Sequence, residues 1–242
     1  MKTYGLIGKN IDYSFSRNYF NTKFKNENIE NSNYVNFDIQ DLSEIKTIFE
    51  EKHFGYNVTI PYKESIIPFL DKLDKDTKEI GAVNTIKVHK DGSLEGFNTD
   101  YYGFMKSIKP YLKKHHKKAL ILGTGGASKA VAFALKKMKI EFKFVSRNPK
   151  ANQLSYESLT EMHFNEAHII INTTPIGTFP DIDKAPKIPY SLITNKHLVF
   201  DLIYNPSETQ FLINAKANNA VTLNGLDMLI NQAEKAWEIW NQ

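Results

Sequence analysis

The amino-acid sequence predicts an α/β protein built from two lobes, and three observations predict it. Its 242 residues suffice for one large α/β domain or for two lobes of ordinary size. Hydrophobic residues make up 41% of the chain, which favours packed cores over disorder. Short strand-like segments alternate with amphipathic stretches, and a second series of such segments begins at Lys117.

The first series of segments predicts four strands. They are short and rich in β-branched and aromatic residues, with the sequences TYGLIG, NYVNFDI, GYNVTIP and NTIKVHK. Amphipathic stretches separate them, such as the helix candidate DLSEIKTIFEEKH. We therefore expect a βα alternation in this part of the chain.

The second series predicts a parallel sheet that is covered on both faces. Its strand-like segments KALILG, EFKFVSR, AHIIINTT and KHLVFDLIY are apolar almost without interruption, and SKAVAFALKKM is a helix candidate between the first two. The last segment, LDMLINQAEKAWEIW, is a helix candidate with an apolar stripe formed by Leu229, Ala233, Ala236, Trp237 and Trp240. That stripe needs a partner surface.

Composition and charge exclude several classes of protein. The chain has no cysteine, which excludes disulfides, thiolate catalysis and cysteine-ligated metal, and agrees with a reducing compartment. It has no run of about 18 apolar residues and no signal-peptide pattern, so we expect a cytoplasmic protein without a membrane partner. The net charge of +4 is modest, and we interpret KKHHKK at residues 113–118 as a solvated connector, not a nucleic-acid or nucleotide-steering site. The seven histidines lack the spacing of a metal hydrolase, so no metal is expected.

A glycine-rich turn predicts a dinucleotide site. Gly123, Gly125 and Gly126 lie between an apolar strand and a good helix, and Thr124 and Ala127 complete the turn. Without Cβ atoms, the backbone amides can approach a pyrophosphate at the helix N-terminus, where unpaired N–H groups and the helix dipole favour an anion. The spacing departs from G-x-G-x-x-G, and a tight turn without a ligand is the structural alternative.

The end of the next strand predicts NADP(H) over NAD(H). An NAD site normally places an Asp or Glu about 20 residues after the glycines, where it binds the ribose hydroxyls. This chain reads VSRNPK there, and offers the hydroxyl of Ser146 and the cations of Arg147 and Lys150 to a 2′-phosphate. Exposed basic residues in a loop are the structural alternative.

Two further polar residues are candidates for chemistry on a carbonyl group. Lys63 stands in NVTIPYKES, just past an expected strand end and behind a rigid proline step. A hydride donor needs a carbonyl acceptor, and the alkoxide that forms needs a proton or a positive charge, either of which a lysine supplies. Asp100 ends the block GFNTD, and its carboxylate would orient an ammonium group and a substrate hydroxyl. A surface lysine and a helix N-cap aspartate are the structural alternatives.

Seven polar blocks, in this order, resemble the signature blocks of the shikimate dehydrogenase family. They are NVTIPYK, GAVNTI, GFNTD, GTGGASKA, NTTPIGTFP, DLIYNPSET and NGLDMLINQA, and they cover most of the chain. The resemblance implies the NADP-dependent, reversible reduction of 3-dehydroshikimate to shikimate on the route to chorismate and the aromatic amino acids. It also implies two lobes with a cleft between them. We expect a substrate lobe at residues 1–100, completed by 225–242, and a Rossmann-like NADP lobe at 101–224.

The resemblance implies roles for individual residues. Lys63 and Asp100 match the catalytic pair, and Lys63 is the expected proton donor when the ketone is reduced. Ser14 and Ser16 match two hydroxyls that hold the substrate carboxylate, although serines are also common at turns and helix starts. The other matches are Thr59, Asn84 and Gln232 for the ring hydroxyls, Tyr204 for the substrate beside the nicotinamide, Gly225 and Thr173 for the cofactor, and Met228 near the substrate. Asn84 as a turn residue, Gln232 as a satisfied core amide and Met228 as core filling are the alternatives.

Three positions depart from the family pattern. Arg17 stands where a proline is common, Thr178 replaces a frequent methionine, and Ser146 stands where asparagine is frequent. An enzyme that also oxidises quinate or uses NAD is one alternative, and a regulatory nucleotide-binding module without turnover is another. The presence of both Lys63 and Asp100 disfavours the second alternative. As partners we expect a small-molecule substrate and no nucleic acid or membrane, in a monomer or homodimer.

Overall fold

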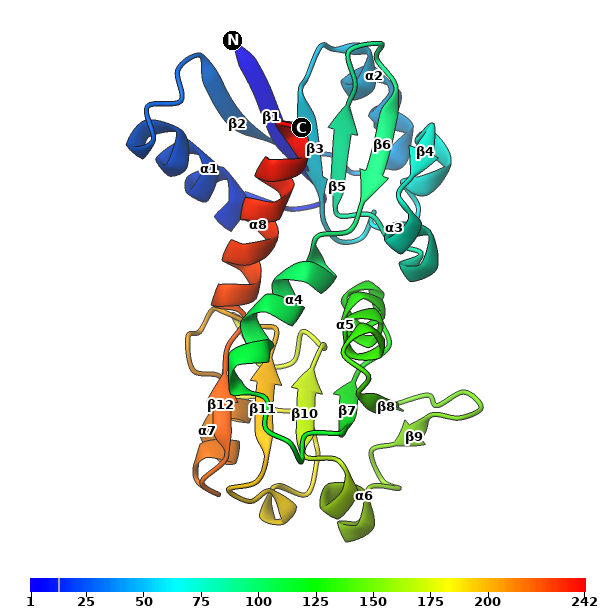
Figure 1. The fold of residues 1–242 in the computed structure, drawn as a ribbon, viewed down its shortest axis with the longest axis vertical. Helices are drawn as coiled ribbons and strands as arrows, with labels where there is room; N and C mark the ends of the chain where they lie inside the picture. The colour runs from blue at the N-terminus through cyan, green and yellow to red at the C-terminus, as the bar shows by residue number, and fades with distance from the viewer. Residues whose placement is uncertain (13) are drawn as a thin grey trace. The chain divides into compact units, whose positions relative to one another are not determined.

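The structure, a computed structural model, describes residues 1–12 and 14–242 and divides the chain into two compact units (Figure 1). Unit 1 comprises Met1–Thr99 and Ala233–Gln242, and unit 2 comprises Asp100–Gln232. Each unit contains one six-stranded sheet. The lobes expected from the sequence, 1–100 with 225–242 and 101–224, stay a prediction about which residues serve the substrate and which serve the cofactor.

Unit 1 contains a mixed sheet with the strand order β2-β1-β3-β5-β6-β4. Its strands are β1 (Lys2–Gly8), β2 (Ser32–Asp38), β3 (Gly55–Val58), β4 (Lys72–Leu73), β5 (Thr85–Val88) and β6 (Leu94–Phe97). The pairs β1–β2 and β1–β3 are parallel, whereas β5 is antiparallel to both β3 and β6. The expected βα alternation is therefore wrong for β5 and β6. Asp91 and Gly92 supply a tight turn that joins these two strands directly, with Gly92 at φ +85° and Asp91 Oδ1 accepting from the Ser93 amide.

Two apolar clusters cover the two faces of this sheet. The helices are α1 (Phe15–Asn26), α2 (Ile45–Glu50), α3 (Lys75–Ile80) and the end of α8 (Leu226–Trp240), with short 3-10 turns η1 (Leu42–Glu44) and η2 (Ile67–Phe69). Tyr4 and Leu6 of β1 join the cluster with α1 and α8, while Ile7 joins the cluster with Ile45 of α2. Successive residues of a strand point to opposite faces, so a single strand contributes to both clusters.

The apolar stripe predicted on the last helix finds its partner surface in unit 1. Ala233, Ala236 and Trp240 are buried, and Trp240 Nε1 donates to the Ile86 carbonyl at 3.0 Å. The indole lies so close to Gly55 that a Cβ there would come within 2.3 Å of the ring. A side chain at position 55 would therefore displace the indole.

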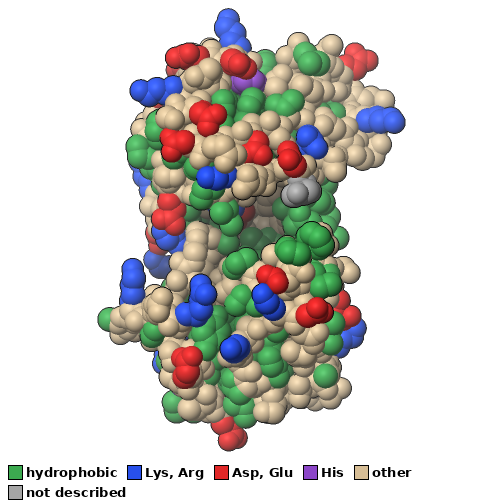
Figure 2. Space-filling view, turned by 180° about the vertical axis from the view of Figure 1, so that it is seen from behind, with side chains coloured by type: hydrophobic (Ala, Val, Ile, Leu, Met, Phe, Trp, Pro, Cys, Tyr) green, Lys and Arg blue, Asp and Glu red, His purple; other side chains and the backbone are tan. Residues whose placement is uncertain are grey.

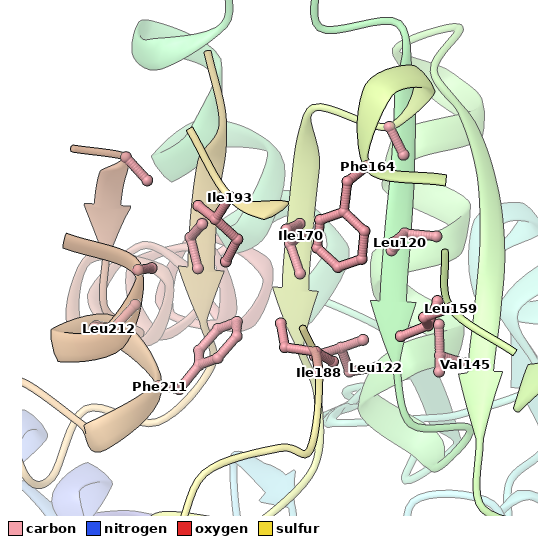
Figure 3. Packing of buried hydrophobic residues seen from close by; sticks show 14 residues of the cluster. Leu120, Leu122, Val145, Leu159, Phe164, Ile170, Ile188, Ile193, Phe211 and Leu212 are labelled. Atoms are coloured by element: carbon pink, nitrogen blue, oxygen red, sulfur yellow. The ribbon is translucent and has the colours of Figure 1, made fainter. Parts of the chain in front are cut away.

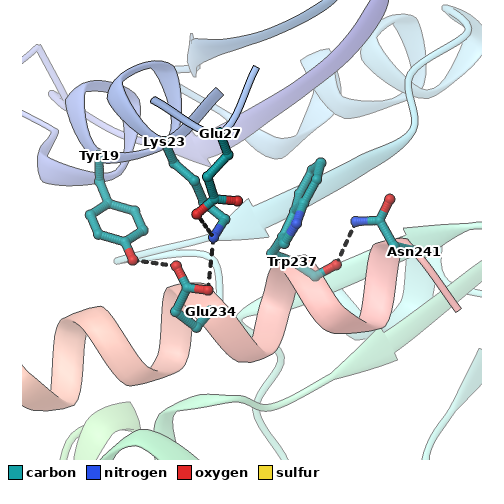
Figure 4. A network of polar contacts seen from close by, with 6 residues as sticks. All are labelled: Tyr19, Lys23, Glu27, Glu234, Trp237 and Asn241. Carbon is teal, nitrogen blue, oxygen red and sulfur yellow. Dashed lines mark hydrogen bonds and ion pairs between the residues drawn. The ribbon is translucent and has the colours of Figure 1, made fainter. Parts of the chain in front are cut away.

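A polar network fastens α8 to α1 at the edge of the same cluster (Figure 4). The Tyr19 hydroxyl donates to Glu234 Oε1, and Lys23 Nζ donates to Glu234 Oε2 at 2.9 Å. Lys23 also pairs with Glu27 on its own helix at 2.7 Å. One lysine thus joins two carboxylates, and the network fixes the rotation of α8 about its axis.

Unit 2 contains a parallel sheet with the order β12-β11-β10-β7-β8-β9, which confirms the parallel sheet predicted for this region. Its strands are β7 (Lys118–Leu122), β8 (Glu141–Ser146), β9 (Leu154–Ser155), β10 (Ile169–Asn172), β11 (Leu198–Asp201) and β12 (Val221–Leu223). Its helices are α4 (Asp100–Ile108), α5 (Gly126–Lys137), α6 (Glu161–Glu166), α7 (Gln210–Lys216) and the start of α8, with 3-10 turns η3 (Lys109–Tyr111) and η4 (Tyr190–Leu192). In this sheet, β8 and β9 lie on one side of β7, and β10, β11 and β12 lie on its other side, so the strand order reverses at β7. Ligands of open parallel sheets bind at such a reversal, beyond the carboxyl ends of the strands.

Helices cover both faces of this second sheet. Ala119 and Ile121 of β7 pack on the face with α4 and α5, and Leu120 packs on the face with α6 and α7. Figure 3 shows Phe164 beside Leu120 and Ile170 on that second face. The nearly continuous apolar strands follow from this burial on both faces.

The basic run at residues 113–118 is less exposed than the solvated connector that we expected. Its lysines point mostly to solvent, but His116 is only 5% exposed. Four histidine rings of unit 2 form a chain of contacts, with centroid separations of 4.3 Å, 5.3 Å and 5.3 Å; they are His115, His116, His168 and His197. Burial lowers the pKa of His116, His168 and His197, and neighbouring histidines lower these pKa values further.

We expect His168→Phe to reduce the loss of stability in acid. Histidines of the unfolded chain bind protons near pH 6.5, whereas the folded cluster binds them only at lower pH, so the free energy of unfolding falls as the pH drops below that value. The variant removes one such ring, and with it an Nδ1 that is buried without a hydrogen-bond partner among the described residues. Melting temperatures at pH 7.5 and pH 5.0 check this: the drop should be smaller than in the wild type by roughly 2–4 °C. An equal drop in both proteins, or the same change in the control His89→Phe of unit 1, would contradict it.

Charged side chains of both signs are interspersed on the face shown in Figure 2. Among residues 1–12 and 14–242, no group of three or more His, Cys, Asp or Glu side chains is arranged to hold a metal ion. In the same part of the chain, every helix is too short or too polar to cross a membrane.

Candidate active site

Lys63 lies in the turn that follows β3 of unit 1. Its carbonyl accepts from the Val83 amide at 2.7 Å, which ties the turn to the residue before Asn84. The neighbouring Tyr62 is buried and donates its hydroxyl to the Ile39 carbonyl at 2.8 Å. The partly buried Lys63 side chain therefore starts from a backbone that is fixed on both sides.

Thr59 lies at the same edge of the sheet. Its amide donates to the Ile7 carbonyl at 2.9 Å, and its methyl group lies against Gly8, where a Cβ would approach within 2.5 Å. The structure thus brings the predicted residues Thr59, Lys63 and Asn84 together where β3 ends and β5 begins.

Asn84 is buried, and its side chain holds the end of unit 1. Asn84 Oδ1 accepts from the Thr99 amide at 2.6 Å, and Asn84 Nδ2 donates to the Thr99 hydroxyl at 2.9 Å. Thr99 directly precedes Asp100. Asn84 consequently positions the backbone from which the candidate carboxylate projects, a role that its sequence block does not reveal.

A buried chain of hydrogen bonds links Asn84 to Ser16. The Tyr34 hydroxyl is hydrogen-bonded to the Ser16 side chain and donates to Asn57 Oδ1 at 2.7 Å. Asn57 Nδ2 in turn donates to the Asn84 carbonyl at 3.2 Å. Burial raises the pKa of Tyr34 well above its usual value, so its hydroxyl remains a proton donor. Sequence reasoning missed Tyr34 and Asn57 because their partners are distant in the chain.

Ser14 and Ser16 stand at the start of α1. Ser14 is the N-cap, and its hydroxyl accepts from the Arg17 amide at 3.5 Å, while Ser16, the second residue of the helix, is buried. Ser14 therefore has the helix-start role that the sequence analysis gave as the alternative. As the N-cap, its hydroxyl lies at the N-terminal end of α1.

Asp100 is the first residue of α4 in unit 2, and it is buried. One turn later, Gly103 lets α4 and the start of α8 approach closely, because a Cβ there would come within 2.4 Å of the Met228 carbonyl and 3.0 Å of Gln232. Asp100 and the buried Gln232 thus lie on helices in direct contact. Met228 belongs to the core cluster with Phe104, which supports the core-packing alternative for its side chain.

The glycine-rich turn has the geometry that an anion site requires. Gly123 has φ +103°, and a Cβ there would come within 2.9 Å of Thr173 Oγ1. Gly125 is the N-cap of α5, and a Cβ there would meet nothing within 4 Å. The turn therefore leaves open space at Gly125, at the helix end where the first amides have no partner within the helix. The Thr173 hydroxyl donates to the Leu122 carbonyl at 2.7 Å and holds the neighbouring loop against the turn.

Arg147 lines a cavity of about 550 Å³ beyond the end of β8. The other lining residues are Tyr156, Glu157, Ile176, Lys184, Ala185 and Lys187. Two other residues predicted at this strand end are engaged in the loop itself: the Ser146 hydroxyl accepts from the Asn148 amide at 3.2 Å, and the Lys150 amide donates to Gln153 Oε1 at 3.1 Å. Sequence reasoning missed the lysines of the β10–β11 segment, for which the run DIDKAPK was the available signal.

Tyr204 and Gly225 lie in loops that a buried carboxylate organises. Asp201 Oδ2 accepts from the Thr209 hydroxyl at 2.6 Å, and Asp201 Oδ1 accepts from the Ile203 amide at 3.1 Å. Burial raises the pKa of Asp201 to about 6. Gly225 packs on the same segment, since a Cβ there would come within 2.0 Å of the Leu202 carbonyl. Tyr204 is exposed in the loop that follows Asp201.

Comparisons with known proteins give matches over nearly the whole chain. The family model described as "Shikimate dehydrogenase substrate binding domain" matches residues 6–86. A curated relative from Methanosphaera stadtmanae, named shikimate dehydrogenase (NADP(+)), is 40% identical over 98% of this chain and 90% of its own length. The crystal structure of shikimate dehydrogenase from Aquifex aeolicus is 36% identical, with a TM-score of 0.88 over 100% of this chain and 92% of that chain. Shikimate 5-dehydrogenase from Thermus thermophilus, solved in complex with NADP(H) and shikimate, is 29% identical, with a TM-score of 0.88 over 99% of this chain and 93% of that chain. The predicted α/β fold with a Rossmann-like lobe is confirmed.

Proposed function

Because the chain belongs to the shikimate dehydrogenase family, we propose that it catalyses the NADP-dependent, reversible reduction of 3-dehydroshikimate to shikimate, on the route to chorismate and the aromatic amino acids. The observation that carries the proposal is the near full-length similarity to NADP-dependent shikimate dehydrogenases. The intact Lys63 and Asp100 support it. A cytoplasmic location and a monomeric or homodimeric state are part of the same proposal.

The residues of unit 2 fit NADP(H). The amides of Gly125 and Gly126 would hold the pyrophosphate, because they stand at the N-terminus of a 12-residue helix and a Cβ at Gly125 would meet nothing within 4 Å. Arg147 would hold the 2′-phosphate, and Thr173 and Gly225 would shape the loops on either side. When bound, NADPH supplies the hydride that reduces the ring ketone.

The residues of unit 1 fit the polar substituents of the ring. Ser14 and Ser16 would bind the carboxylate, because a helix start offers hydroxyls and free amides to an anion. Thr59 and Asn84 would bind ring hydroxyls. Unit 2 would supply Gln232 for a ring hydroxyl and Tyr204 for the substrate. The hydrogen bonds from Ser16 through Tyr34 and Asn57 to Asn84 support this assignment. They hold the proposed carboxylate-binding residue Ser16 and the proposed hydroxyl-binding residue Asn84 in place before the substrate binds.

Lys63 and Asp100 carry the proton transfer. As the carbonyl carbon accepts hydride, its oxygen gains negative charge, and the Lys63 ammonium group gives that oxygen a proton. The Asp100 carboxylate orients the ammonium group and a neighbouring ring hydroxyl. In the reverse direction, neutral Lys63 takes the proton back from the alcohol.

We expect Arg147→Ala to weaken NADPH binding by roughly 10- to 100-fold and to leave NADH binding within about twofold, because a charge-assisted bond to phosphate is worth about 1.5–3 kcal/mol. Fluorescence titration with both nucleotides measures this. Arg17→Ala, which removes the only other arginine of the chain, serves as the control and should bind both nucleotides as the wild type does. Unchanged NADPH binding by Arg147→Ala would contradict the assignment.

An absorbance assay tests the function itself. The protein should oxidise NADPH when 3-dehydroshikimate is added, and should turn over NADH much more slowly. In the reverse direction, shikimate should be oxidised in preference to quinate. Absence of turnover with 3-dehydroshikimate and both nucleotides would refute the proposal, and equal rates on quinate would favour a broader quinate and shikimate dehydrogenase.

A further inference from the structure

We propose that Lys184 and Lys187, on the segment between β10 and β11, complete the binding site for the 2′-phosphate of NADP(H) and set much of the preference for NADP(H) over NAD(H). The inference deepens the proposed function and takes the identity of the ligand from it. It assigns a specificity role to two residues that lie outside every block that resembles the family. The geometry of one cavity in unit 2 carries it.

That cavity is built by two separate segments. Arg147, Tyr156 and Glu157 come from the segment that follows β8, and Ile176, Lys184 and Lys187 come from the segment that follows β10. Both segments leave the carboxyl edge of the sheet, where ligands of parallel sheets bind. Its volume of about 550 Å³ gives room for an adenine ring and a phosphorylated ribose. The apolar side of the cavity, formed by Tyr156, Ile176 and Ala185, suits the adenine.

The backbone that carries the two lysines is anchored in the core. Pro186 and Ile188 are buried, and Ala185 packs against the same apolar cluster as Tyr156. The Lys184 carbonyl lies against Gly177, which has φ +98° and where a Cβ would come within 2.8 Å of that oxygen. Lys184 and Lys187 are exposed on either side of this buried stretch. Both lysines therefore line the cavity from a backbone that is fixed.

The charges around the cavity match a phosphate monoester. Its lining residues include three cations and one carboxylate, that of Glu157. A phosphate monoester carries a charge of about −1.5 to −2 at neutral pH. Lys184 also pairs with Asp181 at 2.9 Å, but both side chains are more than 60% exposed, at 65% and 62%. Such an exposed pair is weak, so the lysine can turn to a phosphate at little cost. NAD(H) has a neutral 2′-hydroxyl and gains nothing from these cations.

The test uses fragments of the cofactor as well as the cofactor itself. The variant is Lys184→Gln with Lys187→Gln, and the probes are adenosine 2′,5′-bisphosphate, adenosine 5′-monophosphate, NADPH and NADH, titrated by calorimetry or fluorescence. The matched control, Lys114→Gln with Lys117→Gln, removes the same charge from exposed lysines before β7, at the other end of the strands. Fragment binding needs no turnover, so the result is independent of whether 3-dehydroshikimate proves to be the substrate.

We expect the double variant to bind adenosine 2′,5′-bisphosphate and NADPH about tenfold more weakly for each lysine removed, with a smaller dependence on salt. Binding of adenosine 5′-monophosphate and NADH should stay within about twofold of the wild type, and the control should resemble the wild type throughout. The inference is overturned if the double variant binds the 2′-phosphorylated probes as tightly as the control does. Equal weakening of all four probes would also overturn it, because it would show damage to the adenosine pocket instead of loss of phosphate recognition.

Discussion

Lys63→Ala should lower kcat for the reduction of 3-dehydroshikimate by about 10³-fold while NADPH binding stays nearly unchanged. A positioned general acid contributes about 10²–10⁴-fold, and Lys63 is the one cationic side chain among the residues proposed to contact the substrate. Lys63 lies in unit 1, whereas the residues that fit NADP(H) lie in unit 2. Steady-state kinetics and nucleotide titration measure the two effects separately.

Lys63→Arg separates two roles of the lysine. An arginine keeps the positive charge but holds its proton at all relevant pH values, so it stabilises an alkoxide without protonating it. If Lys63 is the proton donor, this variant should be nearly as slow as Lys63→Ala. Lys52→Ala, at an exposed position of unit 1, is the control and should keep wild-type kcat. Turnover at the wild-type rate by Lys63→Ala would refute the assigned role.

Asp100→Asn should lower kcat by about 10²- to 10³-fold with little change in stability. Asparagine has the same shape and still accepts a hydrogen bond, but it lacks the charge that orients an ammonium group. Asp100 is buried at the first residue of α4, where loss of the carboxylate's interaction with the helix dipole costs at most about 2 kcal/mol. Thermal melting therefore distinguishes a catalytic loss from an unfolded protein.

Asp227→Asn is the matched control, because Asp227 is the carboxylate in the first turn of α8. Because Asp227 is exposed, the variant should change stability by no more than Asp100→Asn does, and it should leave kcat near the wild-type value. A comparable fall in kcat for both variants would mean that Asp100 affects catalysis only by supporting the structure of the protein. That result would contradict its assignment to the catalytic pair.

Sequence reasoning was most successful where the signal is local. The parallel sheet of unit 2 was predictable because continuous apolar strands such as Ile169–Asn172 require burial on both faces. The glycine turn was predictable because glycine, unlike other residues, readily adopts conformations such as the φ of +103° at Gly123. The hairpin of β5 and β6 was missed because strand direction depends on a four-residue turn, and the periodicity of the two strands carries no information about it.

The parts of the site that sequence reasoning missed are built from distant contacts. Tyr34 gains its importance from Asn57 and Ser16, which come from other elements of unit 1. Lys184 and Lys187 join Arg147 only because the segments after β8 and β10 end at the same edge of the sheet. His116 is buried, and its Nε2 is hydrogen-bonded to the carbonyl of Lys196, which follows it 80 residues later in the chain. Tyrosine, lysine and histidine side chains are common on protein surfaces. Their roles in this protein depend on contacts with residues that are distant in the sequence.

The central claim is that Lys63 and Asp100 act as one unit on the same bound ketone. A double-mutant cycle on kcat, with Lys63→Ala, Asp100→Asn and the double variant, measures their coupling most directly. Groups that act together lose their joint contribution when either is removed, so the double variant should be about as slow as the slower single variant. If instead the two losses multiply, the residues act independently and the proposed catalytic pair is wrong.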